Sequence, residues 1–338
     1  MERTELTNLG EFGLIQRISK NFTSINPSTK LGIGDDAAVI DTGNNRYTLI
    51  STDMLLEGVH FDLSYMPLRH LGYKAVAINV ADIAAMNGLP EQITVSIGIS
   101  NRFSLEAIDE FYAGVKLACE SYKVDLVGGD TSSSRSGLVI SVTAVGSVAK
   151  NKIVYRSGAK PNDILCVTGD LGAAYLGLQV LEREKQVFLS NPDMQPELES
   201  KAYLVQRQLK PEAKTDFIYE LLEAGVVPTS MIDISDGLAS ELLHITSQSG
   251  VGAIVFEEKI PVDVLSDETA MEFKMSAITA ALNGGEDYEL LFTIKQADFE
   301  KIKNLPDVIP IGYITEDKAT DLMLRSGSRV PLTAQGWK

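Results

Sequence analysis

The chain has 338 residues, of which 44% are hydrophobic and 22% charged, and its formal net charge at pH 7 is −16. This composition is typical of a globular protein, and the length favours two domains over one. The negative charge argues against a general nucleic-acid binder, because contacts to phosphate need a basic surface.

Cysteine occurs only at Cys119 and Cys166, without a CxxC motif, so we expect no disulfide framework and a reducing compartment. Residues 1–5 have no apolar signal core, and the apolar run at 75–86 is short and carries Asn79 and Asp82. We therefore expect no membrane span and predict a cytoplasmic location.

The first distinctive stretch is Gly32-Ile33-Gly34-Asp35-Asp36, which follows a short predicted helix at 12–18 and a polar loop. Two glycines permit a tight turn, and the two carboxylates then enter what reads as a strand. Side chains alternate across a strand, so one carboxylate has to point inward, where it needs a cation or hydrogen-bond donors. Taken alone, the stretch is more typical of an ordinary turn, because Gly/Asp clusters are common turn formers.

The rest of the first half alternates between strands and helices. Residues 47–50 predict a strand that runs into Ser51-Thr52-Asp53, and 138–148 predict a long strand that returns antiparallel. Helices are predicted at 71–87 and at 104–122, the second with Ser104 as N-cap, and further strands at 93–97 and 124–127. We expect helices packed on a largely antiparallel sheet up to about residue 150.

The second half begins after the Arg156-Ser157-Gly158-Ala159-Lys160-Pro161 stretch, so we divide the chain into domains 1–150 and 151–338. A helix follows Asp170-Leu171-Gly172, and 186–200 read as a surface loop. Strands are predicted at 164–168, 231–234, 253–256, 288–293 and 309–314, with Ser235-Asp236-Gly237 opening a helix. The fold class is α/β of the α+β type, with an α/β sandwich in the second domain.

Acidic residues beside Gly, Ser or Thr recur along the chain, and most lie at predicted strand ends or loops, where binding residues concentrate. They are Asp35, Asp36, Asp53, Asp82, Asp130, Asp233 and Asp236. The three histidines are scattered without zinc-like spacing, and all-oxygen ligands favour Mg²⁺ over a softer metal. Asp82 lies in an apolar helix, where an unpaired carboxylate would be costly.

Each candidate also has a plain structural interpretation. Asp236 could be a helix N-cap, and Asp130 could be a turn residue in Gly128-Gly129-Asp130-Thr131. Asp82 and Asn79 share a helix face and could pair with neighbouring backbone, and His60 could be a packing residue. Glu286 and Asp287, ahead of a strand, could form a solvated charge pair.

Neither a G-x-x-x-x-G-K-[ST] loop nor a G-x-G-x-x-G helix start is present, so the common nucleotide-binding signatures are missing. If the protein uses ATP, metal ions have to hold the phosphates, because few basic residues flank the acidic loops. Arg156 is the best-placed cation. From the residues alone we infer an Mg²⁺-dependent enzyme that handles phosphate groups.

Taken together and in order, the motifs resemble the thiamine-monophosphate kinase family within the aminoimidazole ribonucleotide synthetase-like superfamily. They cover nearly the whole chain: Gly32-Ile33-Gly34-Asp35-Asp36, Ser51-Thr52-Asp53, Glu57-Gly58-Val59-His60-Phe61, Asn79 to Met86, Gly128-Gly129-Asp130-Thr131, Arg156-Ser157-Gly158-Ala159, Asp233-Ile234-Ser235-Asp236-Gly237-Leu238 and Gly284-Gly285-Glu286-Asp287-Tyr288-Glu289.

The resemblance implies transfer of the ATP γ-phosphoryl group to thiamine phosphate with several Mg²⁺ ions, in a homodimer whose active sites lie near the interface. It implies an N-terminal ATP- and metal-binding dimerisation domain and a C-terminal domain that completes the site. The metal ligands it implies are Asp36, Ser51, Thr52, Asp53, Asp82, Asp130, Asp233 and Asp236, of which Asp36, Asp53, Asp130 and Asp236 would be catalytic. ATP would contact Tyr112, Gly129, Asp130, Arg156 and Ser235, and thiamine phosphate would contact His60, Glu286 and Trp337.

Two departures limit the carry-over. Many members of the family read Gly-Asp-Ser where this chain has Asp170-Leu171-Gly172-Ala173-Ala174, so we assign no role there, and the chain stops soon after Trp337. Two alternative functions remain: an ATP-dependent synthetase acting on a ribonucleotide amide, and a non-catalytic acidic metal-binding dimer.

Overall fold

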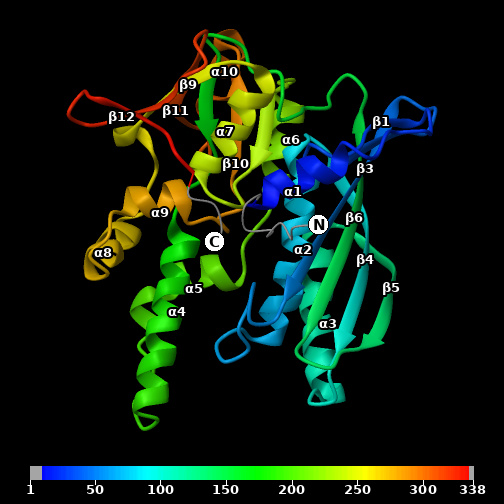
Figure 1. The fold of residues 1–338 in the computed structure, drawn as a ribbon, viewed down its shortest axis with the longest axis vertical. Coiled ribbons are helices and arrows are strands. Elements are labelled where there is room, and N and C mark those ends of the chain that lie inside the picture. The colour runs from blue at the N-terminus through cyan, green and yellow to red at the C-terminus, as the bar shows by residue number, and fades with distance from the viewer. Residues whose placement is uncertain (1–9, 335–338) are drawn as a thin grey trace, which may run out of the picture.

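The computed structural model describes residues 10–334, which form two sheets flanked by helices (Figure 1). The N-terminal half contains α1 (Gly10–Ser19), β1 (Thr29–Leu31), β2 (Ala38–Asp41), β3 (Arg46–Leu56), α2 (Leu68–Ala85), β4 (Leu89–Ile99), α3 (Leu105–Tyr122), β5 (Asp125–Ser133) and β6 (Val139–Ala149). The C-terminal half contains β7 (Ile164–Val167), α4 (Ala173–Ser190), α5 (Ala202–Leu209), α6 (Thr215–Glu223), β8 (Ser230–Asp233), α7 (Leu238–Ser249), β9 (Gly252–Phe256), α8 (Val264–Glu272), α9 (Ala277–Asn283), β10 (Leu290–Ile294), α10 (Gln296–Ile302), β11 (Ile309–Thr315), β12 (Thr320–Met323) and β13 (Arg329–Pro331).

The N-terminal sheet has six strands in the order β1-β2-β3-β6-β4-β5. Neighbouring strands are antiparallel except for the β4–β5 pair, so the predicted largely antiparallel sheet is confirmed. Helices α2 and α3 lie along one face of this sheet (Figure 1). The Ser104 hydroxyl accepts a hydrogen bond from the Ala107 N–H and caps α3, as predicted.

The C-terminal sheet has seven strands in the order β13-β12-β9-β11-β7-β10-β8, with β12 parallel to β9 and the other pairs antiparallel. Two local predictions are wrong. Helix α4 continues to Ser190, so the loop predicted at 186–200 begins later, and Gly128–Thr131 belong to strand β5 rather than to a turn. Within residues 10–334 we find no helix long and apolar enough to cross a membrane.

Helix α2 is buried on almost every side, because it packs against the first sheet and also against the second half of the chain (Figure 1). Its last turn, Ala84 and Ala85, shares a core with C-terminal residues that include Phe217 and Met231. A helix that is apolar all round is expected to be an internal one. Residues on α2 can therefore reach both halves of the molecule.

The crossing of α2 and α3 depends on two glycines. A Cβ added at Gly72 would lie 2.0 Å from the Phe111 carbonyl oxygen, and one at Gly114 would lie 1.9 Å from the Arg69 carbonyl oxygen. The two backbones approach each other too closely for any side chain at these positions.

We expect Gly114→Ala to lower the free energy of unfolding by about 1–3 kcal/mol or more, because the methyl group forces α3 away from α2. The shift in urea midpoint measures this loss. Glu120→Ala, an exposed change on the same helix, is the control. Equal midpoints for the two variants would contradict the close-packing argument.

Candidate active site

Three carboxylates from distant segments meet where the two halves join. Asp36 precedes β2, Asp82 lies in the last turn of α2, and Asp233 ends β8. One carboxylate oxygen from each lies within 4.8 Å of the others. The sequence predicted these three residues as metal ligands, and the structure brings all three together.

Asp36 is held by one arginine and keeps one oxygen unsatisfied. Its Oδ1 accepts hydrogen bonds from Nη2 and Nε of Arg156, at 2.6 and 3.1 Å. Its Oδ2 is buried and, among the described residues, has no hydrogen-bond partner. A buried acceptor without a donor is destabilising unless a cation or water reaches it.

Strand β3 supplies two further polar groups from the face covered by α2. Ser51 and Asp53 are two residues apart and therefore lie on the same face of the strand, and their hydrogen bonds show that this face meets α2. The Ser51 hydroxyl donates to Asp82 Oδ2, and the Asp53 N–H donates to Asn79 Oδ1 at 3.0 Å. Asn79 in turn donates to the Ala75 carbonyl, so the interpretation as a partner of neighbouring backbone holds for Asn79, whereas Asp82 accepts from the Ser51 side chain.

Two predicted ligands lie elsewhere within this chain. The exposed Thr52 side chain points to the opposite face of β3 and donates to the Val142 carbonyl. Asp130 lies on β5, in register across Ser96 and Ser141 with Met54 of β3. Three strand spacings separate Asp130 from β3, or about 14 Å.

The turn after β8 brings Ser235 and Asp236 beside the cluster. The Asp236 N–H donates to Oε1 of Glu241, which is buried, and α7 has no side-chain N-cap bond, so the N-cap interpretation of Asp236 is wrong. The Ser235 carbonyl accepts from the Glu286 N–H at 2.7 Å. The sequence analysis did not identify Glu241 as a site residue. Its position in the first turn of α7, five residues after Asp236, could have indicated that it lies beside the site.

The crowded carboxyl groups resist ionisation. Burial, followed by the charge of Asp53, raises the pKa of Asp82 well above its ordinary value. Burial and the Asp36 charge raise the pKa of Asp233 in the same way. Burial and Asp36 also raise the pKa of the neighbouring Asp35 to about 7. A bound cation would relieve this repulsion.

Three of the residues predicted to bind ATP line one cavity. Tyr112, Gly129 and Asp130 border a cavity of about 450 Å³ between α3 and the outer strand β5. A Cβ on Gly129 would lie 1.8 Å from the Val95 carbonyl oxygen, so only glycine fits there. Arg156 and Ser235 lie at the acidic cluster instead, away from this cavity.

The residues predicted to bind thiamine phosphate differ in their surroundings. His60 Nδ1 accepts from the Leu56 N–H at 3.0 Å. Burial raises the pKa of the nearby Asp53 carboxyl, and the hydrogen bond with Asp82 and the charge of His60 offset only part of that rise. Glu286 is buried and paired with Lys74, so its interpretation as a solvated pair with Asp287 is wrong. Trp337 lies outside the described residues.

The other acids of the Gly-Gly-Glu-Asp-Tyr-Glu motif are structural. Asp287 accepts from the N–H groups of Gly172 and Ala174 at the start of α4. Glu289 pairs with Arg207 at 2.8 Å and with Lys214 at 3.0 Å. These ion pairs fix the segment that presents Glu286.

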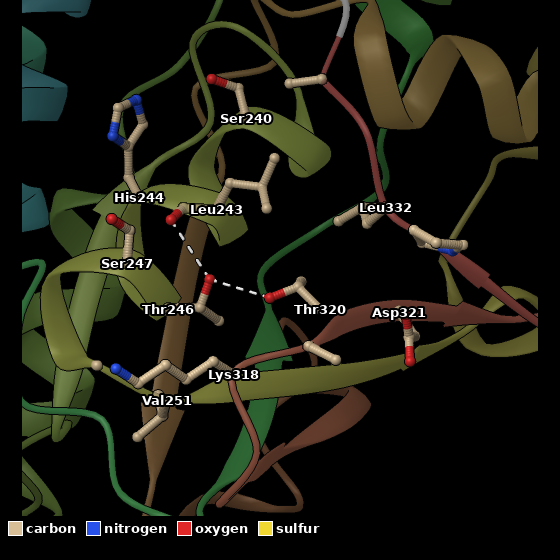
Figure 2. A pocket seen from close by; sticks show the side chains of 14 residues that line it. Ser240, Leu243, His244, Thr246, Ser247, Val251, Lys318, Thr320, Asp321 and Leu332 are labelled. Carbon is tan, nitrogen blue, oxygen red and sulfur yellow. Dashed lines mark hydrogen bonds between the residues drawn. The ribbon is translucent and has the colours of Figure 1, made fainter.

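A larger cavity of about 790 Å³ lies between α7 and the β12–β13 hairpin (Figure 2). The Thr246 hydroxyl joins its two walls, because it accepts from the Thr320 hydroxyl at 3.1 Å (Figure 2). His244 lines one side, and burial and then the Arg156 charge lower its pKa. This cavity is next to the acidic cluster but contains none of the predicted site residues.

The donors at the cluster are all oxygens, and one of them is buried without a partner. Hard oxygen donors of this kind fit Mg²⁺ better than a soft metal. The residues that could hold such an ion are Asp36, Asp82 and Asp233, with Ser51, Asp53 and Asp236 around them.

Comparison with protein-family models identifies the class of protein to which the chain belongs. Residues 34–148 match the family model "AIR synthase related protein, N-terminal domain", and residues 160–325 match "AIR synthase related protein, C-terminal domain". The structure is also similar to a chain of a solved structure described as "Crystal structure of HypE-HypF complex", with a TM-score of 0.72 at 20% identity, covering 95% of this chain and 99% of that one, which concerns the fold alone. The chain is therefore an AIR synthase related protein with both characteristic domains.

Relatives with higher sequence identity to this chain identify the family within this class. The chain is 36% identical over 336 residues to the thiamine-monophosphate kinase of Aquifex aeolicus, covering 98% of this chain and 99% of the relative. It is 34% identical to the Bacillus subtilis enzyme of the same name, covering 94% and 95%. A solved structure described as "AaThiL complexed with AMPPCP and TMP" has a TM-score of 0.86 at 34% identity and covers 100% of this chain and 99% of that one. The chain belongs to the thiamine-monophosphate kinase family.

The raised carboxyl pKa values predict how stability depends on pH without divalent cations. A group whose pKa is higher in the folded state favours folding at low pH and loses that contribution as pH rises through its folded pKa. With a chelator present, we expect the free energy of unfolding to decrease between about pH 4 and pH 7, by up to about 1.4 kcal/mol per pH unit for each proton released. The melting temperature should fall over the same range.

Thermal unfolding across this range measures the slope. Asp82→Asn removes one of the raised groups and should make the fall shallower, whereas the exposed change Glu300→Gln should leave it unchanged. A melting temperature that stays level or rises with pH in the chelated protein would contradict the assignment.

Proposed function

We propose that the chain transfers the γ-phosphoryl group of ATP to thiamine phosphate, giving thiamine diphosphate and ADP, with Mg²⁺ held at the acidic cluster. The observation that carries the proposal is the meeting of Asp36, Asp82 and Asp233 at the junction of the two halves. The names of the relatives and the ligands of the solved structure supply the identity of the substrates. The free thiols of Cys119 and Cys166 are consistent with a cytoplasmic location.

The chemistry needs no general base. The nucleophile is an oxygen of the substrate phosphate, which is already anionic at neutral pH. The bond from the γ-phosphorus to the bridging oxygen breaks, ADP leaves with the electron pair, and a new bond forms to the substrate oxygen. The difficulty is to bring two anionic groups together, so positioning and charge neutralisation are the main tasks.

The side chains divide these tasks. Asp36, Asp82 and Asp233 would hold Mg²⁺, supported by Ser51, Asp53 and Asp236. When bound, Mg²⁺ would screen the negative charge of the two phosphate groups. Arg156 lies at the edge of the cluster, because its backbone N–H donates to Asp35 and its guanidinium donates to Asp36, and the guanidinium would contribute a further positive charge.

The two substrates would enter from different sides. Tyr112 and Gly129 would receive the nucleotide in the 450 Å³ cavity. Because His60 Nδ1 accepts a backbone hydrogen bond, a neutral His60 carries its proton on Nε2 and can donate it to a phosphate oxygen. Glu286 would bind thiamine phosphate at another point.

Incubation of the protein with ATP, Mg²⁺ and thiamine phosphate should yield thiamine diphosphate, detected by chromatography. Asp53→Asn and Asp233→Asn should lower turnover on the order of a hundredfold or more, because they remove negative charge that holds the metal. Asp267→Asn on the exposed side of α8 is the control. Absence of product from the wild type would overturn the function, and near-normal turnover by both site variants would overturn the metal site.

We also propose that the protein acts as a homodimer with shared sites, residues 1–150 supplying nucleotide binding and dimerisation and residues 151–338 completing the site. Strand β5 is exposed along its whole length, which is unusual for a strand that does not pair further. Its Asp130 is too far from the acidic cluster to join it within one chain. A symmetric partner could bring its Asp130 to the cluster of the first copy.

Mixing two inactive variants tests the sharing. Asp36→Asn and Asp130→Asn, unfolded and refolded together, should recover about a quarter of wild-type activity, because half of the dimers would be mixed and each would keep one intact site. Each variant refolded alone is the control. No recovery in a mixture that sediments as a dimer would contradict a shared site.

A further inference from the structure

Lys74 is a lysine in the middle of the buried helix α2, and its side chain is 1% exposed. Its Nζ donates to Glu286 Oε2 at 2.7 Å and to the Gln208 carbonyl oxygen at 3.1 Å. An ammonium group in such a position is strongly destabilising unless it is paired and hydrogen-bonded. The pair therefore ties Glu286 of the C-terminal half to a helix of the N-terminal half.

Glu286 is held in an unusual conformation. Its φ is +61°, a left-handed value that residues other than glycine rarely adopt and that often marks functional sites. The backbone is fixed by the hydrogen bond from its N–H to the Ser235 carbonyl, next to the acidic cluster. The strain is thus maintained by contacts on both the backbone and the side chain.

The two side-chain donors that reach this carboxylate from the described residues meet the same oxygen. Lys74 Nζ and Gln208 Nε2 both bind Oε2, each at 2.7 Å. The Glu286 side chain keeps 12% of its surface exposed. Oε1 is therefore left as an oriented acceptor for a donor on a ligand.

Helix α2 carries both the ion pair and one ligand of the acidic cluster. Lys74 and Asp82 are eight residues apart, so their backbones are separated by about 12 Å along the helix axis and belong to different turns. A carboxylate repels a phosphate group, so a ligand with its phosphate at the cluster would present a different part to Glu286. In thiamine phosphate the donor at the far end is the amino group of the pyrimidine ring.

We propose that Lys74 is a positioning residue for substrate recognition: with Gln208, it orients Glu286 so that Oε1 accepts a hydrogen bond from the amino group of thiamine phosphate. This inference rests on the proposed kinase function, in which Glu286 contacts the substrate, and it adds the residue that holds the Glu286 carboxylate in place. Lys74 itself is too deeply buried to touch the ligand, so it acts through Glu286.

Steady-state kinetics of Lys74→Met separates this role from a structural one. The variant should raise KM for thiamine phosphate at least about tenfold, because a hydrogen bond to an oriented charge is lost. Its KM for ATP should change less than about twofold. Lys201→Met is the matched control: Lys201 is also buried and ion-paired, to Glu272 at 2.6 Å, and its loss should reduce stability but alter neither KM.

A double variant tests whether Lys74 acts through Glu286. Glu286→Gln should show the same selective rise in KM, and adding Lys74→Met to it should raise KM no further. Lys74→Met alone should also lower the melting temperature by leaving a buried carboxylate unpaired, and Glu286→Gln should restore part of that loss. Should Lys74→Met fail to fold, Gln208→Met removes the other donor to Oε2 and should raise the same KM about threefold.

Three results obtained with an active wild type would overturn this inference while leaving the proposed function intact. Lys74→Met could leave KM for thiamine phosphate unchanged, it could raise both KM values equally, or it could raise KM further when added to Glu286→Gln. If Lys74→Met does not fold and Gln208→Met is used in its place, an unchanged KM for thiamine phosphate would also overturn the inference. A wild type that makes no thiamine diphosphate overturns the proposed function and this inference with it.

Discussion

Repulsion among three carboxylates governs the centre of this molecule. Asp36, Asp82 and Asp233 come from segments nearly 200 residues apart, and their oxygens lie within 4.8 Å. Like charges at that separation are strongly unfavourable away from water, so the arrangement persists only if protons, Arg156 or a bound cation compensate. Binding of a cation to the folded form alone then stabilises the join between the two halves. With Mg²⁺ bound as proposed, cation binding and association of the two halves would be a single equilibrium.

The sequence predicts a large part of this arrangement because its signals are local. Helical spacing identified α2 and α3, Ser104 was readable as a cap, and a carboxylate inside an apolar helix marked Asp82. Asp36 and Asp233 were found as acids beside glycine or serine near strands. Each of these inferences needs only a few neighbouring residues and the cost of burying a charge.

What the sequence could not predict depends on pairing between distant strands. Strand register puts Asp130 about three strands from Met54, and alternation along β3 turns Thr52 away from Ser51. The run Gly128–Thr131 has the composition of a turn but extends β5, because its backbone pairs with β4. Lys74 offered a local signal that was missed: a lone lysine in an apolar helix needs a buried anion as much as Asp82 needs a cation.

The burial of α2 has a consequence for how the chain is made. The first sheet and α2 are synthesised well before residues such as Phe217 and Met231, which cover the last turn of that helix. Domains synthesised first usually fold first, yet here the central helix of the first domain has to wait for the second. Until then an apolar surface and the unpaired Lys74 ammonium remain exposed to water. We therefore expect the N-terminal half to complete its packing late, because Glu286, the ion-pair partner of Lys74, is synthesised near the end of the chain.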